Sequence, residues 1–318
     1  MTKKRIFGFI VLVLTICLTC CLLFACNDNT PDKPDNPNTP DTPDTPDTPD
    51  VPDDSDDTDD TDKPQAKFYE QKEGYTYGED VEITYHSNVT DTDRKALVTL
   101  PANYDSSKKY PVLYLLHGMS CDYKYWNDSC SAKYVVQNLH VDKGVREMII
   151  VAVDSNITNG KVPSWTSTEY FEMFDKTGEE LVNSLMPYIN ANYSTLTGRG
   201  NTAIAGFSMG GRETLLTAFG YQDYFNYVGA FSPSGFGDKA ISTDTTVPDF
   251  KYEKGKNFSV LMLAIGNMDT MTGLFYPHID SKLSENNIKH LSKKYMGGHA
   301  PSVWRNALYD FVQLIFKK

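Results

Sequence analysis

The stretch Asn201–Leu216, with the sequence NTAIAGFSMGGRETLL, constrains the fold of this chain more than any other. An apolar run of strand length, Ala203–Ala205, meets the pentapeptide Gly206–Gly210, and a segment with helical spacing follows at once. This is a G-x-S-x-G pattern between a strand and a helix. A turn that lifts a serine hydroxyl clear of a sheet is so tight that bulky side chains do not fit two positions away. The stretch therefore predicts a strand, turn and helix that present Ser208 as a nucleophile, although a glycine-rich turn with an incidental serine has the same pattern.

The region after residue 65 alternates strand-like and helix-like segments. Residues 81–86 and 96–100 alternate apolar and polar side chains, as an antiparallel edge with one solvated face does. Continuous apolar runs, typical of strands buried on both faces, recur at residues 112–116, 148–153, 202–205, 228–231 and 259–265. Helical spacing links Leu181, Leu185 and Ile189, and later Trp304, Leu308, Phe311 and Ile315. The alternation predicts an α/β domain with a largely parallel sheet and helices on both faces.

A serine hydroxyl is a weak nucleophile at neutral pH, so Ser208 needs a base, and the base needs an orienting acid. Three histidines follow the serine: His278, His290 and His299. We expect His299 to be the base because it lies in the turn Gly297–Ala300, between a strand-like segment and the C-terminal amphipathic helix. For the other two histidines we expect structural places.

The acid is expected between Ser208 and the base, at the end of a buried strand, because the chain order of such sites is Ser, then Asp or Glu, then His. Asp269 leaves the predicted strand 258–265 and is our choice. Asp280 and Asp238 are the alternatives.

Attack of a serine on a carbonyl group also needs backbone N–H groups that face the developing oxyanion. One should come from Met209, the residue after the serine. The second should come from the loop after residues 112–116, which has the sequence HGMS, and we expect it at Met119 or Gly118. His117 is interpreted as a brace of this loop and not as the base.

The N-terminus is typical of an export signal. Lys3, Lys4 and Arg5 precede an apolar run, residues 6–24. The end of this run and the two residues after it have the sequence Leu23-Phe24-Ala25-Cys26. This ending resembles the lipobox of bacterial lipoproteins, in which residues 1–25 are removed and the cysteine is lipidated. Two acyl chains on Cys26 would anchor the chain stably to a membrane. A retained transmembrane segment and ordinary secretion are the alternatives.

Residues 26–65 predict a disordered linker. Residues 27–65 hold 9 Pro and 14 Asp against two lysines, and the triplet TPD occurs four times in a row between Thr39 and Asp50. Apolar side chains are almost absent, so nothing offsets the entropy of ordering. Proline stiffness and charge repulsion favour an extended spacer with a reach on the order of 100 Å. It would hold the domain 66–318 away from the cell envelope, although a solvated tail without such a role has the same composition.

The charge of the folded domain gives no reason to expect a nucleic-acid partner. The chain carries −12, of which the signal contributes +3 and the linker −12, so residues 66–318 carry −3. A basic surface for phosphates is therefore not expected. No metal or cofactor is expected either, because zinc-protease, P-loop and dinucleotide fingerprints do not occur. Cys121 and Cys130, nine positions apart, are compatible with a local disulfide or with two buried thiols.

In combination, these motifs resemble the esterase D-like esterases, in particular the feruloyl and acetylxylan esterases of carbohydrate esterase family 1. The segments that carry the resemblance are 115–118, 203–211 and 297–299 with Trp304. The resemblance covers roughly residues 69–316. It implies an α/β-hydrolase fold without a lid, no metal, and a triad of Ser208, Asp269 and His299. It also implies hydrolysis of the esters that decorate plant xylan.

We therefore expect an exported serine esterase, anchored by lipid outside the cytoplasm, whose substrate is an ester-decorated polysaccharide or oligosaccharide. Siderophore esterases and S-formylglutathione hydrolases share the motifs, so another ester is an alternative. A non-catalytic surface protein that binds carbohydrate on a hydrolase scaffold is the alternative from another class. Four aromatic residues would either stack on the substrate or belong to the core: Trp126, Trp165, Tyr170 and Trp304.

Overall fold

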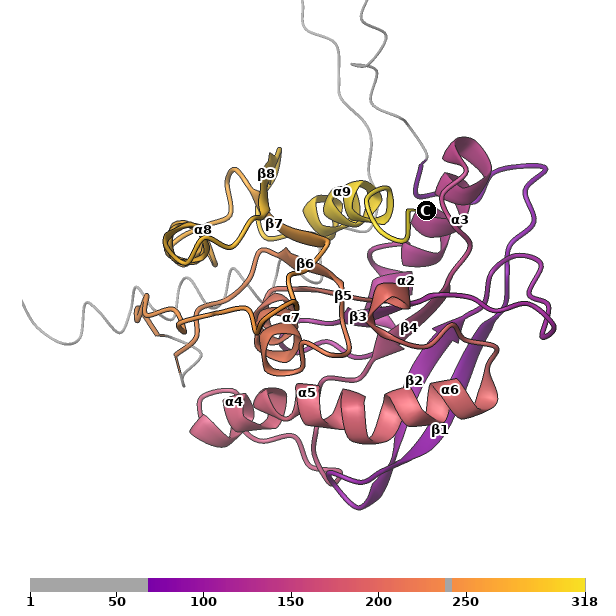
Figure 1. The fold of residues 1–318 in the computed structure, drawn as a ribbon. Helices are drawn as coiled ribbons and strands as arrows, with labels where there is room; N and C mark the ends of the chain where they lie inside the picture. The colour runs from indigo at the N-terminus through magenta and orange to yellow at the C-terminus, as the bar shows by residue number, and fades with distance from the viewer. Residues whose placement is uncertain (1–67, 238–241, 318) are drawn as a thin grey trace, which may run out of the picture. The chain divides into compact units, whose positions relative to one another are not determined.

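The computed structural model describes residues 68–237 and 242–317, which form an eight-stranded sheet flanked by helices (Figure 1). The strands are β1 (Asp80–Ser87), β2 (Thr92–Thr99), β3 (Val112–Leu116), β4 (Ile149–Val153), β5 (Thr202–Phe207), β6 (Tyr227–Phe231), β7 (Val260–Gly266) and β8 (Leu291–Tyr295). The helices are α2 (Tyr125–Asp128), α3 (Ala132–Lys143), α4 (Thr168–Asp175), α5 (Thr177–Glu180), α6 (Met186–Asn192), α7 (Met209–Gly220), α8 (Tyr276–Glu285) and α9 (Pro301–Val312). A π-helical turn, η1 (Leu181–Leu185), joins α5 to α6, and a 3-10 turn, η2 (Arg199–Asn201), precedes β5.

The predicted export signal, the linker and Cys26 lie outside the described residues. Within those residues, every helix is too short or too polar to cross a membrane.

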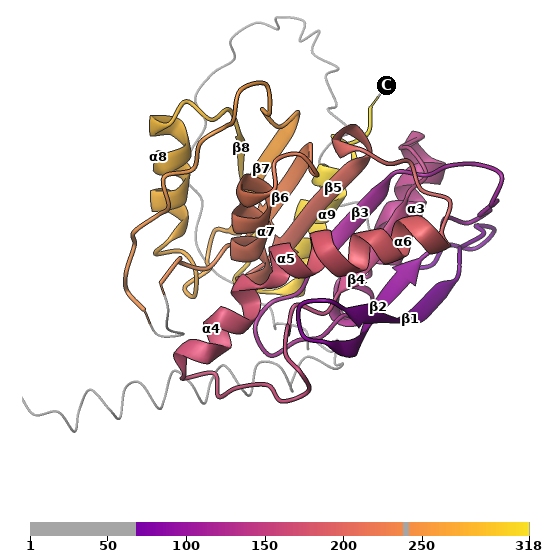
Figure 2. The same cartoon turned by 60° about the horizontal axis from the view of Figure 1, so that its bottom comes forward.

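The sheet has the order β1-β2-β4-β3-β5-β6-β7-β8, and the six strands from β4 to β8 in this order are parallel. Helices α3 and α9 pack on one face of the sheet, and α6, α7 and α8 pack on the other (Figure 2). The predicted parallel sheet with helices on both faces is confirmed. Because parallel strands end at the same edge, the loops after β3, β5, β7 and β8 are brought close together.

Strand β2 departs from the prediction of a solvated edge. It pairs antiparallel with β1 on one side and with β4 on the other, so it is an interior strand. Its last four residues, Ala96–Thr99, are all buried. Only β1 keeps the alternation of an edge strand. At the other end of the chain, α9 stops at Val312, and Ile315 is buried beyond it instead of inside the helix.

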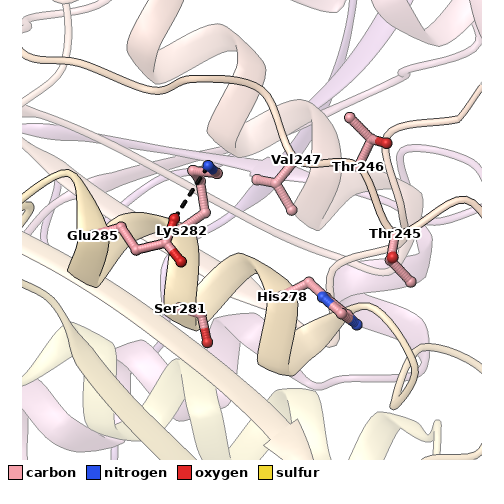
Figure 3. Close-up of a pocket in the computed structure, with 7 residues that line it drawn as sticks. All are labelled: Thr245, Thr246, Val247, His278, Ser281, Lys282 and Glu285. Carbon is pink, nitrogen blue, oxygen red and sulfur yellow. Dashed lines mark ion pairs between the residues drawn. The ribbon is translucent and has the colours of Figure 1, made fainter.

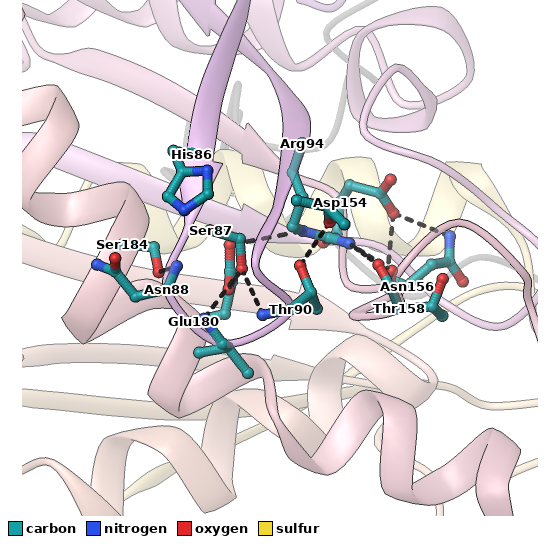
Figure 4. A network of polar contacts seen from close by, with 12 residues as sticks. His86, Ser87, Asn88, Thr90, Arg94, Asp154, Asn156, Thr158, Glu180 and Ser184 are labelled. Carbon is teal, nitrogen blue, oxygen red and sulfur yellow. Dashed lines mark hydrogen bonds and ion pairs between the residues drawn. The ribbon is translucent and has the colours of Figure 1, made fainter.

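A buried ion pair fastens β2 to the helical layer and to the loop after β4 (Figure 4). The Arg94 side chain is 6% exposed, and its Nε lies 3.5 Å from Oε1 of Glu180, which is fully buried. The Ser87 hydroxyl donates to the other oxygen of Glu180 over 2.6 Å. The terminal nitrogens of Arg94 donate to the carbonyls of Asp154, Asn156 and Thr158. The arginine therefore fixes the loop after β4 relative to the sheet.

We expect Arg94→Met to lower the free energy of unfolding by about 3 kcal/mol, because it leaves the Glu180 carboxylate buried without its cation. Urea unfolding followed by circular dichroism measures this change.

Lys95→Met is the matched control. Lys95 pairs with Glu82 over 2.5 Å, but the two side chains are 52% and 35% exposed. Such a surface pair contributes less than about 1 kcal/mol. Equal losses in the two variants would contradict the stabilising role of the buried pair.

Candidate active site

Ser208 lies on the turn between β5 and α7 in an unusual backbone conformation. Its φ is 56° and its ψ is −121°. A residue with a side chain adopts such a conformation only where its surroundings impose it. The Ser208 N–H donates to the carbonyl of Phe231 over 2.9 Å, and the Ser208 carbonyl accepts the N–H of Ser234 over 3.1 Å. The serine is therefore tied to the end of β6 on both sides of its Cα.

The glycines around Ser208 are required by close backbone contacts. A Cβ on Gly206 would lie 2.3 Å from the Gly210 carbonyl oxygen. A Cβ on Gly210 would lie 2.4 Å from the carbonyl oxygen of Leu116 and 2.5 Å from that of His117. The first turn of α7 therefore rests directly on the end of β3, which places the loop after β3 next to the serine.

The structure brings together the three residues predicted for the triad. His299 Nε2 lies 2.9 Å from Ser208 Oγ. Its Nδ1 lies 2.8 Å from Asp269 Oδ2. Because an ionised carboxylate only accepts hydrogen bonds, the imidazole carries its proton on Nδ1. Nε2 is then free to accept the proton of the serine hydroxyl.

Asp269 is held as a carboxylate by donors on both oxygens. Oδ1 accepts the backbone N–H groups of Met271 and Thr272, each over 3.0 Å, and Oδ2 accepts the Thr272 hydroxyl over 3.0 Å. Burial alone would raise the pKa of Asp269. The hydrogen bond and charge of His299, together with the Thr272 N–H, outweigh burial and lower this pKa to about 2.

The imidazole of His299 rests against the aromatic core. Its ring meets the ring of Trp304 edge-on, with centroids 5.1 Å apart. Trp304 in turn stacks on Phe207, the residue before the nucleophile, at 4.0 Å. Trp304 is therefore a core residue, and so is Trp126, whose buried indole donates to the Leu116 carbonyl. Trp165 remains 38% exposed.

The loop after β3 touches the nucleophile itself. A Cβ on Gly118 would lie 2.7 Å from the Phe207 ring and 3.1 Å from Ser208 Cβ. His117 is fully buried. Its Nδ1 donates to the Gly118 carbonyl over 2.7 Å and its Nε2 accepts the Ser155 N–H over 2.9 Å, so both ring nitrogens are engaged and His117 does not act as the base. Met209 is the first residue of α7, where the backbone N–H has no acceptor within the helix. The Met209 N–H and the loop of Gly118 and Met119 therefore both lie next to Ser208.

The other two histidines after Ser208 lie elsewhere. His290 Nε2 lies 3.1 Å from Asp280 Oδ1, which gives this aspartate a partner other than His299. His278 projects from α8 into a cavity of about 310 Å³ (Figure 3). The cavity is lined by Thr245, Thr246, Val247, His278, Ser281, Lys282 and Glu285, and none of the predicted triad residues is among them. Asp238, the other alternative acid, is outside the described residues.

Cys121 and Cys130 are thiols and do not form a disulfide. Burial raises the pKa of the Cys130 thiol, so it stays protonated in the core. Among residues 68–237 and 242–317, no three His, Cys, Asp or Glu side chains are grouped to hold a metal ion.

A charge cluster centred on the buried Arg212 of α7, next to the nucleophile turn, is not predicted from the sequence motifs. Arg212, on α7, contacts the carboxylates of Asp175 and Glu213 and is only 4% exposed. Burial raises the pKa of Glu213 to about 7, although the arginine opposes this shift. The signal in the sequence is the charged pair Arg212-Glu213 inside a helix that is otherwise uncharged. The cluster joins α7 to the end of α4.

The chain is similar in sequence to known esterases. A family model described as "Putative esterase" matches residues 87–260. An endo-1,4-beta-xylanase/feruloyl esterase of Xylanibacter ruminicola is 30% identical over 173 residues, which is 52% of this chain and 23% of that protein. An esterase of Mycobacterium tuberculosis is 32% identical over 142 residues, or 43% of this chain and 28% of that protein. The chain thus matches about a quarter of the length of these curated relatives.

Among solved structures, the chain is similar to a CE1 ferulic acid esterase from the anaerobic fungus Anaeromyces mucronatus. The TM-score is 0.72 and the identity 34%, and the match covers 79% of this chain and 95% of that one. The expected α/β-hydrolase fold is thereby confirmed.

The low pKa of Asp269 predicts a pH dependence of stability. Because the folded state holds this pKa at about 2, below the ~3.9 of an unfolded aspartate, the ionised group stabilises the fold above about pH 4. That contribution is lost as the pH falls from about 4 through 2. We expect Asp269→Asn to show a flatter decline of unfolding free energy over this window than the wild type, measured by urea unfolding at each pH.

Asp128→Asn, which removes an exposed carboxylate on α2, serves as the control and should keep the steeper wild-type decline. A wild-type slope in Asp269→Asn would show that the carboxylate is not stabilised as the structure indicates.

Proposed function

The chain belongs to the "Putative esterase" family, and we propose that it is a serine carboxylic ester hydrolase that works through an acyl-enzyme. The observation that carries the proposal is the hydrogen-bonded series from Ser208 Oγ through His299 to Asp269, at 2.9 and 2.8 Å. A nucleophile, a base and an orienting carboxylate in contact are the arrangement that acyl transfer requires.

In this mechanism Ser208 Oγ attacks the ester carbonyl carbon while His299 Nε2 takes the hydroxyl proton. The N–H groups of Met209 and of the Gly118–Met119 loop stabilise the oxyanion of the tetrahedral intermediate. His299 then returns the proton to the departing alcohol oxygen. A water molecule, deprotonated by His299, then attacks the acyl carbon. His299 returns this proton to Ser208 Oγ as the bond between the serine and the acyl group breaks and the acid is released. Asp269 keeps the proton on Nδ1 and stabilises the imidazolium in both steps.

The proposed substrate is a feruloyl or acetyl ester on a xylan-type polysaccharide. Support comes from the ferulic acid esterase that matches at 34% identity over 95% of its length. The relative described as endo-1,4-beta-xylanase/feruloyl esterase supports the same class of substrate.

We also propose that Cys26 carries a lipid anchor and that residues 26–65 act as a spacer, so that the domain works outside the cytoplasm. The basic residues, apolar run and Ala25-Cys26 junction support the anchor. The acidic, proline-rich composition of the next forty residues supports the spacer. A polymeric substrate is too large to enter a cell, which makes an external location suitable for such an enzyme.

Ser208→Ala is expected to abolish release of ferulate from feruloylated arabinoxylan fragments and labelling by a fluorophosphonate probe, because the attacking oxygen is removed. Acetate release from acetylated xylan, measured in parallel by chromatography, identifies the preferred acyl group. Ser284→Ala, which removes an exposed hydroxyl on α8, is the control and should keep full activity. A wild type that is not labelled, or labelling that survives Ser208→Ala, would refute the enzyme proposal and favour a non-catalytic binding protein.

Cys26→Ser is expected to abolish incorporation of a fatty acid into the full-length protein, because the hydroxyl cannot accept the lipid at this step of processing. Metabolic labelling with a fatty acid, compared with the amount of protein seen by immunoblotting, measures the change. Lipid labelling that is equal in wild type and variant would contradict the anchor.

A further inference from the structure

The loop after β3 contains a peptide plane whose orientation is fixed by two bonds. The Gly118 carbonyl oxygen accepts His117 Nδ1–H over 2.7 Å and the Cys121 N–H over 3.3 Å. A peptide group is planar, and its C=O and N–H point in opposite directions. Since this carbonyl belongs to the same peptide as the Met119 N–H, that N–H is turned away from His117.

The next peptide is held by a residue from a different element. Ser120 has φ 59°, in the left-handed region that residues with side chains avoid. Its N–H donates to the hydroxyl oxygen of Tyr170 over 3.1 Å. Tyr170 lies on α4 and is 3% exposed, whereas Ser120 is exposed, so this bond is partly buried. The bond opposes relaxation of Ser120 and thereby fixes the far side of Met119.

Helix α4 is itself tied to the helix that begins at the nucleophile. Asp175, at the end of α4, is paired with Arg212 of α7. Residues of both helices also form one buried apolar cluster, which consists of Tyr170, Phe171, Met173, Phe174 and Met209. Met119 packs against this cluster. Tyr170 is therefore positioned relative to the same turn that carries Ser208.

We infer that Tyr170 is a positioning residue of the oxyanion hole: its hydroxyl holds the Met119–Ser120 peptide so that the Met119 N–H, and not that of Gly118, serves as the second donor beside Met209. Tyr170 acts through the loop and does not touch the substrate; of the two alternatives for its ring, stacking on the substrate and burial in the core, its burial favours the second. The inference rests on the proposed esterase function. Burial raises the pKa of Tyr170, which keeps the hydroxyl neutral.

Tyr170→Phe tests the inference, since it removes the hydroxyl and keeps the ring. The oxyanion exists only after attack, so a misplaced donor lowers kcat and leaves KM unchanged. We expect kcat for a feruloyl ester to fall by about 10-fold, less than the loss of a whole donor. The kcat is expressed per site labelled to completion with fluorophosphonate, so that unfolded protein does not count.

Tyr110→Phe is the matched control. Tyr110 is also 3% exposed, and its hydroxyl also accepts a backbone N–H, that of Asp105, over 3.0 Å. It lies before β3, at the end opposite to Ser208, so kcat should stay at the wild-type value. Thermal unfolding of both variants reports any general loss of stability.

A second readout separates the oxyanion hole from ground-state binding. Phenylboronic acid forms a tetrahedral adduct with a nucleophilic serine and places an oxygen in the hole, whereas ferulate, the product, does not form this bond. We expect Tyr170→Phe to weaken inhibition by the boronic acid by about 10-fold and to leave inhibition by ferulate unchanged.

The inference is overturned if kcat and boronic acid inhibition of Tyr170→Phe equal those of Tyr110→Phe. It is also overturned if KM rises at constant kcat, because that result would place Tyr170 in substrate binding. Either result, with activity still dependent on Ser208, leaves the esterase proposal intact. The esterase proposal itself would be refuted by activity or labelling that does not depend on Ser208.

Discussion

The contact between the first turn of α7 and the end of β3 is the constraint on which the rest of the site depends. The backbone of Gly210 lies directly on the carbonyls of Leu116 and His117, at a distance that no side chain permits. This contact holds Ser208 above the sheet edge and brings Gly118 against its Cβ. The neighbouring positions of β3 and β5 in the sheet thus place a nucleophile and the loop beside it within reach of one carbonyl group.

Assembly of the remaining groups follows from the parallel sheet. Asp269 leaves β7 and His299 leaves the loop after β8, so each side chain comes from a different strand end. Their order in space follows the strand order, with the carboxylate and imidazole on the side of Ser208 opposite to the loop after β3. Rigid strands followed by short loops are well suited to hold such groups at fixed distances.

The sequence was most informative where the signals are local. The glycine spacing around Ser208 is visible in a few adjacent residues. The same is true of the turns that follow the predicted strands at Asp269 and Gly297, and the structure brings these groups together. The buried pair of Arg94 and Glu180 could not be predicted, because it depends on burial by segments far apart in the chain. The interior position of β2 was missed for a related reason, since alternation does not tell which strand will lie beside it. The spacing of two cysteines in the sequence does not give the distance between their side chains, so the sequence leaves open whether Cys121 and Cys130 form a disulfide.

The stacking of Trp304 on Phe207 has a consequence for the order in which a growing chain acquires reactivity. The nucleophile precedes its base by 91 positions, and the imidazole is supported by a ring from the final helix. A chain that emerges from its N-terminus carries Ser208 long before any group can accept its proton. In the proposed mechanism, the capacity to cleave esters therefore arises only when α9 docks on the sheet, so that completion of the fold and onset of hydrolysis are the same event.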